Sequence, residues 1–186
     1  MSSNNFLTFK NNFNLNFNGL YLLKHNKFGF FLETNENSLH NLLFILRDSE
    51  NCLFKLLIDI FVVDYPGNNK RFCLIYCLLS LKYNVRLNVK LYLNEFTSVS
   101  SCANIYKSAC WLEREVWDMS GLFFENHPDL RRILTDYGFE GFPLRKDFPL
   151  SGYKEARYDD SQKRVISENI EMAQEYRVFN FKSSWE

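Results

Sequence analysis

Net charge and long apolar runs are both missing from this 186-residue sequence. The 22 Lys and Arg residues balance 22 Asp and Glu residues, so no net field draws the chain to nucleic acid or to an anionic membrane. No apolar run approaches the roughly 20 residues that a membrane-spanning helix needs. Any association with a membrane is therefore expected to run through partner proteins.

Cysteine and histidine are few and scattered. The five cysteines have no C-x-x-C spacing, and Cys73 and Cys77, four residues apart on an expected strand, would lie about 13 Å apart along it. That separation is too large for a shared metal ion, so we expect reduced, buried thiols. The three histidines stand alone, and no glycine-rich phosphate loop or nucleophile elbow is present. The sequence therefore predicts no metal, cofactor or catalytic site in this chain.

Hydrophobic residues, in contrast, make up 46% of the chain and include 19 Phe, which suffices for a buried core. Strands are expected over 28–32, 53–63, 71–81 and 85–93. Segment 71–81 is apolar on both faces, as in a central strand, and 85–93 alternates cleanly. Short connections predict that the last three strands form an antiparallel meander. The expected buried face of 53–63 consists of Phe54, Leu56, Ile58, Ile60 and Val62.

Two helices are indicated by apolar residues at helical spacing. Ser38 is expected to cap the first, whose apolar face is Leu39, Leu42, Leu43 and Leu46. Ser100 or Ser101 is expected to cap the second, whose stripe is Ile105, Ala109, Leu112, Val116 and Met119. Amphipathic helices of this kind pack on one face of a sheet. The predicted fold class is α+β: a two-layer domain with a mixed or antiparallel sheet and two main helices, followed by an extended C-terminal tail.

The pattern changes after residue 126. Residues 127–153 hold three of the four prolines and three of the seven glycines, and a short helix is predicted between Pro128 and Gly138. Residues 145–186 interleave charged and aromatic side chains without a period, a composition typical of protein interfaces. A loose, solvated tail is the alternative. The predicted divisions are a low-complexity segment over 1–19, an α+β domain over 20–126, and a short helix with a partner-docking tail over 127–186.

The stretch WLEREVWDMSGLFF over 111–124 places four charged side chains beside two tryptophans. Paired carboxylates can perform acid–base catalysis, but Glu113 and Glu115 would point about 200° apart on a helix. Ion pairing at a helix end or at an interface is the favoured interpretation of this stretch. A capping or structural role is favoured for His127, which precedes a proline.

Basic residues further along the chain could grip phosphate, but acidic residues alternate with them. Salt bridges inside the chain or across subunits are therefore favoured. The predicted partner interface consists of Glu113, Arg114, Asp118, His127, Arg131, Arg132, Tyr137, Arg145, Lys146, Asp147, Phe148, Tyr153, Arg157, Tyr158 and Arg177.

One long segment, EREVWDMSGLFFENHPDLRRILTDYGFEGFPLRKDFPLSGYKEARYD, carries a family resemblance. Together with DYPGNNKRFCLIYCLLSLKYNVRLNVK before it, and with KRV and QEYRVF after it, it resembles the thirty-kilodalton (NuoC-type) subunit family of respiratory complex I. Three positions depart from the family pattern. Ser120 stands where an aromatic residue is usual, Phe142 where histidine is common, and Asn169 near a usual proline.

The resemblance implies a core subunit of the peripheral arm of NADH:ubiquinone oxidoreductase, which passes electrons from NADH to ubiquinone and pumps protons. It implies no active site or cofactor in this chain, with FMN and iron–sulfur clusters carried by other subunits. It also implies docking on the large neighbouring subunit that helps to form the quinone site.

The expected location is the matrix side of the mitochondrial inner membrane, and the gene is expected to be mitochondrial. The N-terminal sequence lacks a transit-peptide pattern, and the chain is rich in Asn, Phe, Leu, Ile, Lys and Tyr. A bacterial complex is the alternative location. Two other classes of function stay open: a stand-alone enzyme using Glu113, Asp118 and His127, and a nucleic-acid-binding module with a basic, aromatic sheet face.

Overall fold

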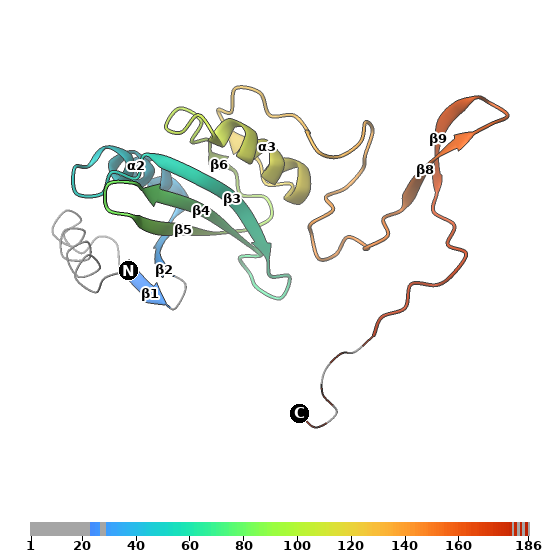
Figure 1. Ribbon diagram of the computed structural model, residues 1–186, viewed down its shortest axis with the longest axis horizontal. Coiled ribbons are helices and arrows are strands. Elements are labelled where there is room, and N and C mark those ends of the chain that lie inside the picture. The colour runs from blue at the N-terminus through green and yellow to red at the C-terminus, as the bar shows by residue number, and fades with distance from the viewer. Residues whose placement is uncertain (1–22, 27–28, 180, 182, 184, 186) are drawn as a thin grey trace. The chain divides into compact units, whose positions relative to one another are not determined.

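The computed structural model describes residues 23–26, 29–179, 181, 183 and 185 (Figure 1). The chain divides into two compact units, Met1–Phe148 and Pro149–Glu186. The first unit contains the α+β fold that the sequence predicts, and the second contains a β-hairpin. The expectations for residues 1–19 lie outside the described residues.

A five-stranded mixed sheet forms the first layer of the first unit. The predicted antiparallel meander is confirmed, because β4 pairs with β3 on one side and with β5 on the other. The remaining edge was not predicted: β2 runs parallel to β5 and β1 pairs antiparallel with β2. The strand order is β1-β2-β5-β4-β3, with the bounds β1 Leu23–Asn26, β2 Gly29–Thr34, β3 Leu56–Asp64, β4 Phe72–Ser80 and β5 Val85–Leu93.

Helices α2, Glu36–Asp48, and α3, Ala109–Ser120, form the second layer. One core joins the four predicted leucines of α2, residues of α3 and one face of the sheet. The N-cap prediction for α2 was wrong, because the helix begins at Glu36, after Asn35. Ser38 lies in the first turn, where its hydroxyl donates to the Asn35 carbonyl at 3.2 Å.

Strand β3 differs from its predicted alternation. A register shift between Leu57 and Asp59 moves the side chains on the two sides of it to opposite faces. Leu57 and Ile60 are buried as a result, whereas Leu56 and Ile58 are 42% and 45% exposed. The prediction that Leu56 and Ile58 belong to the buried face was therefore wrong.

Helix α3 begins at Ala109, later than predicted. The segment before it has other hydrogen-bond partners: β6, Val99–Ser100, pairs with β7, Phe124–Glu125, and the Ser101 N–H donates to the Glu125 carbonyl at 2.9 Å. The helix ends at Gly121, which has a φ of 76°. A left-handed residue at this position favours glycine, which has no Cβ to strain.

The short helix predicted between Pro128 and Gly138 is not formed, although the structure describes every residue of that segment. Three consecutive backbone N–H groups, those of Ile133, Leu134 and Thr135, bind one carboxylate oxygen of Asp118. A tertiary contact therefore determines the conformation of this loop, which a local sequence pattern does not reveal.

The second unit contains the antiparallel hairpin of β8, Lys154–Asp159, and β9, Arg164–Asn169, drawn in orange in Figure 1. The predicted tail is thus folded in part rather than extended throughout. No described residue between 149 and 185 is buried. Among the described residues, no helix has both the length and the apolar character needed to cross a bilayer.

Candidate functional site

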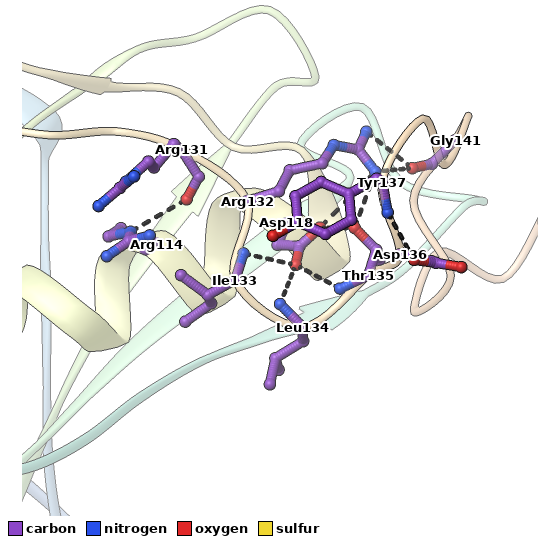
Figure 2. Close-up of polar contacts among 10 residues, drawn as sticks. All are labelled: Arg114, Asp118, Arg131, Arg132, Ile133, Leu134, Thr135, Asp136, Tyr137 and Gly141. Carbon is purple, nitrogen blue, oxygen red and sulfur yellow. Dashed lines mark hydrogen bonds and ion pairs between the residues drawn. The ribbon is translucent and has the colours of Figure 1, made fainter.

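Asp118 lies at the centre of the charged cluster that the sequence singles out (Figure 2). Its side chain is fully buried on α3. Oδ2 accepts hydrogen bonds from the N–H groups of Ile133, Leu134 and Thr135 at 3.1, 2.7 and 2.9 Å, and Oδ1 accepts one from the Thr135 hydroxyl at 2.6 Å. One carboxylate thus fixes the loop that follows the helix.

The charge of Asp118 is stabilised by its surroundings. Burial raises the pKa of its carboxyl, but the hydrogen bonds from Thr135, Leu134 and Ile133 outweigh burial and hold the pKa below its ordinary value. The Arg132 guanidinium lies 3.6 Å from Oδ1 and also donates to the Gly141 carbonyl at 3.0 Å. Asp118 therefore acts as a buried anion that organises backbone.

Arg114 and Arg131 have different roles, although both were predicted at the interface. Arg114 is 7% exposed, lies 5.1 Å from the Trp111 ring and donates from Nε to the Arg131 carbonyl at 3.0 Å. The Arg131 side chain is 72% exposed and pairs with Asp129 at 2.9 Å. Arg114 thus holds the backbone of the loop, and Arg131 offers its side chain to solvent.

Glu113 and His127 form a second buried cluster. Glu113 accepts hydrogen bonds from the Ser101 hydroxyl at 2.6 Å and from the Cys102 N–H at 2.7 Å. The N–H of Asp129 donates to His127 Nδ1 at 3.1 Å, which leaves Nε2 to donate to the Cys110 carbonyl at 3.0 Å. His127 Nε2 also lies 3.7 Å from Glu113, and both side chains have no exposed surface.

The alternative of a stand-alone enzyme finds no geometric support in these residues. A general acid or base must come within hydrogen-bond reach of a substrate. Glu113, Asp118 and His127 have fully buried side chains that bond to the chain's own groups. They hold loops in place and present no reactive atom to solvent.

Residues 142–148 pack on the C-terminal end of α3 and on the β3–β4 turn. The Leu144 N–H donates to the Met119 carbonyl at 3.0 Å, and Arg145 Nε donates to the Ser120 carbonyl at 2.7 Å. The Phe142 ring lies so close to Gly121 that a Cβ there would be 2.6 Å from it. These contacts occupy two of the positions, Ser120 and Phe142, that depart from the family pattern.

The other predicted interface residues divide into two groups. Lys146 donates its backbone N–H to Asp64, Asp147 pairs with Arg71 at 3.1 Å, and the Phe148 ring lies 5.9 Å from that of Phe139. The remaining five are exposed, Arg157 among them although it pairs with Glu168 at 2.7 Å: Tyr137, Tyr153, Arg157, Tyr158 and Arg177.

Sequence reasoning did not find the partners that fix these residues, namely Asp64, Arg71, Ser101 and Thr135. A serine, a threonine and a turn-flanking ion pair have no signature at sequence level. Their importance depends on contacts between segments 7 to 82 residues apart along the chain.

The five cysteines were tested for a metal or cluster site and do not fit one. All five are free; Cys52, Cys73 and Cys102 are buried, and Cys77 and Cys110 are half-buried. In the part of the chain that the structure describes, no three His, Cys, Asp or Glu side chains converge as metal ligands. The donors that an iron–sulfur cluster requires are therefore not brought together.

Comparison with known proteins places this geometry in a family. The family described as "Respiratory-chain NADH dehydrogenase, 30 Kd subunit" matches residues 32–154. This chain belongs to that family. The predicted family is thereby confirmed, and with it the prediction that the chain is a subunit of a respiratory-chain NADH dehydrogenase. The family match covers β3, β4, β5, α3 and the loop bound by Asp118.

Similar proteins come from both eukaryotes and bacteria. NADH-ubiquinone oxidoreductase subunit 9 of Reclinomonas americana is 55% identical over 155 residues, which cover 83% of this chain and 76% of that protein. A bacterial NADH-quinone oxidoreductase subunit, from Paramagnetospirillum magneticum, is 57% identical over 141 residues, or 76% and 71%. NADH dehydrogenase [ubiquinone] iron-sulfur protein 3 of Beta trigyna is 57% identical over 154 residues, or 83% and 80%.

A solved structure shares the fold. A chain in the membrane-bound sulfane sulfur reductase, an archaeal respiratory membrane complex, aligns with a TM-score of 0.63 at 24% identity. The alignment covers 73% of this chain and 81% of that one. At this identity the likeness concerns the fold alone.

Proposed function

We propose that this chain is a non-catalytic core subunit of the peripheral arm of NADH:ubiquinone oxidoreductase, and that its C-terminal unit docks on a neighbouring subunit. The single observation that carries the docking is the exposure of that unit. Ten large apolar side chains are between 47% and 95% exposed, namely Leu150, Tyr153, Tyr158, Val165, Met172, Tyr176, Val178, Phe179, Phe181 and Trp185. Apolar exposure on this scale marks interaction sites.

The β8–β9 hairpin supports the same proposal. A two-stranded hairpin is marginally stable in water unless a third strand, a helix or another surface packs on it. Within this hairpin, Glu155 lies directly opposite Glu168, which is unfavourable, and only the Arg157 pair at 2.7 Å offsets it. Contact with a partner supplies the burial that the hairpin lacks.

The first unit is suited to a scaffold role because its surface loops are fixed from inside. Asp118 and Arg114 hold the backbone of 131–135, yet Leu134 is 58% exposed and Tyr137 is fully exposed. A loop that is ordered before binding loses little conformational entropy when a partner covers it. Such a subunit would hold cluster-bearing and quinone-binding neighbours at fixed separations.

The finer assignments follow from this proposal. The partner of the C-terminal unit is the large subunit that helps to form the quinone site, and FMN and iron–sulfur clusters reside in other subunits. The complex lies in the mitochondrial inner membrane with this chain on the matrix side. Fractionation of organelles, followed by protease treatment with and without lysis of the inner membrane, tests this location.

Truncation after Phe148 tests the docking. The tagged full chain and the tagged chain ending at Phe148 are expressed in the host cell, and co-purifying subunits are quantified by mass spectrometry. The full chain is expected to retain the other subunits and the truncated chain to lose most of them. A melting temperature of the first unit that is unchanged by truncation excludes misfolding as the cause. Equal recovery of subunits with both chains would contradict the proposal.

A further inference from the structure

Five charged side chains, Asp64, Arg71, Glu95, Arg145 and Asp147, form a connected set that we call the exit network. It joins the β3–β4 turn, the loop after β5 and the last residues before the C-terminal unit. Arg71 lies at its centre. Its Nε and Nη2 donate to the two oxygens of Asp64, each at 2.8 Å, while Asp147 lies at 3.1 Å and Glu95 at 3.6 Å.

The exit network binds both main chain and side chains of residues 145–147. The Lys146 N–H donates to Asp64 Oδ2 at 2.9 Å, on the same carboxylate that Arg71 holds. Arg145 pairs with Glu95, and its guanidinium lies 5.2 Å from the Phe72 ring, to which Arg71 lies at 5.1 Å. Asp64 therefore receives the segment and Arg71 orients Asp64.

Burial decides which contacts of the exit network matter most. The side chains of Asp64 and Arg71 are 3% and 16% exposed, whereas that of Asp147 is 60% exposed. Hydrogen bonds from Arg71 hold the pKa of Asp64 below its ordinary value. An exposed pair such as Arg71–Asp147 contributes little, so the buried, two-point pair with Asp64 carries the connection.

We propose that Arg71 is a positioning residue that holds residues 145–148 on the first unit and so fixes the point from which the docking unit starts. This inference rests on the proposed docking of the C-terminal unit. With the segment held, the tether to that unit begins at Pro149. Released, residues 143–148 join the tether, and a longer, undirected tether lowers the effective concentration of the docking unit at its partner.

Hydrogen exchange on the full chain tests the first half of the inference. In Arg71→Gln, the amides of residues 145–148 are expected to exchange at least about tenfold faster, while the β4 amides are unchanged. Lys55→Gln is the matched control, because it also removes one cation from an ion pair, the exposed pair with Asp48 at 3.0 Å. It is expected to exchange like the wild type. Unchanged exchange at 145–148 in Arg71→Gln, or an equal increase at all amides, would overturn the inference.

Co-purification from the host cell tests the second half. Arg71→Gln is expected to recover severalfold fewer partner subunits than Lys55→Gln, and full recovery despite faster exchange would overturn the positioning role. If Arg71→Gln does not fold, Asp147→Asn serves instead and must raise exchange at 146–148, since no rise would refute the network. The chain truncated after Phe148 separates the two proposals: full recovery with that chain refutes docking, whereas the exchange result concerns Arg71 alone.

Discussion

Replacing Asp118 with Asn removes one negative charge and keeps the shape of the side chain. The carboxylate accepts three backbone hydrogen bonds on Oδ2 and one from the Thr135 hydroxyl on Oδ1. A hydrogen bond to a charged group contributes about 1.5–3 kcal/mol, against about 0.5–1.5 kcal/mol between neutral groups. Losing the charge from three such bonds is therefore expected to cost about 3 kcal/mol.

The expected loss is large enough to measure as a melting temperature. For a chain of this size, each kcal/mol shifts Tm by about 2–4 °C, so Asp118→Asn should lower Tm by roughly 6–12 °C. Thermal unfolding followed by circular dichroism on the purified chain measures this shift. Asp129→Asn is the control, because its side chain is 52% exposed and pairs with the exposed Arg131; about 1 °C is expected there. Equal Tm values for the two variants would refute the role assigned to Asp118.

Two further predictions concern pH and backbone conformation. The pKa values of Asp64 and Asp118 are lowered in the folded chain, so the stability they confer is complete above their unfolded values and is lost as pH falls through the folded values. Tm should therefore be nearly constant from about pH 5 to 7 and fall below about pH 4, and a Tm that rises in acid would contradict this. Gly121→Ala should destabilise by about 1–3 kcal/mol in denaturant unfolding, because φ is 76° and Phe142 fills the Cβ position. Gly67→Ala, with open space around it, should change little, and similar losses for both would count against the packing described.

Local periodicity predicted those parts of the fold whose hydrogen bonds and burial are also local. The four leucines of α2 share one face because their spacing matches the helical repeat, and β5 alternates because one of its faces lies on the core. The bulge in β3 has no comparable pattern. One extra residue between Leu57 and Asp59 reverses which side chains are buried, and the composition on both sides of it is equally apolar.

The site could be predicted in its residue types and not in its contacts. The sequence shows Asp118 and Arg145 as charged residues near a helix end, and ion pairing was the favoured interpretation. The structure instead pairs them chiefly with backbone groups, the N–H groups of 133–135 and the Ser120 carbonyl. The same contacts replace the helix expected after Pro128. Which backbone group a charge binds depends on the tertiary arrangement, which no spacing along the chain encodes.

The parallel pairing of β2 with β5 was equally beyond sequence reasoning. Residues 30–34 and 87–91 are separated by α2, β3 and β4, and the apolar pattern of β2 fits either edge of the sheet. Loop closure over that distance is decided by packing of the whole layer rather than by any local signal.

The docking of the C-terminal unit is tested most directly by trypsin digestion of the isolated chain and of the assembled complex under the same conditions. The hairpin and the residues after it offer exposed cleavage sites at Lys154, Arg157, Lys163, Arg164 and Arg177. Docking predicts rapid cleavage at these sites in the isolated chain and protection in the complex, with β4 resistant in both. Equally rapid cleavage in the complex, or equal protection in the isolated chain, would contradict a unit that is ordered by its partner.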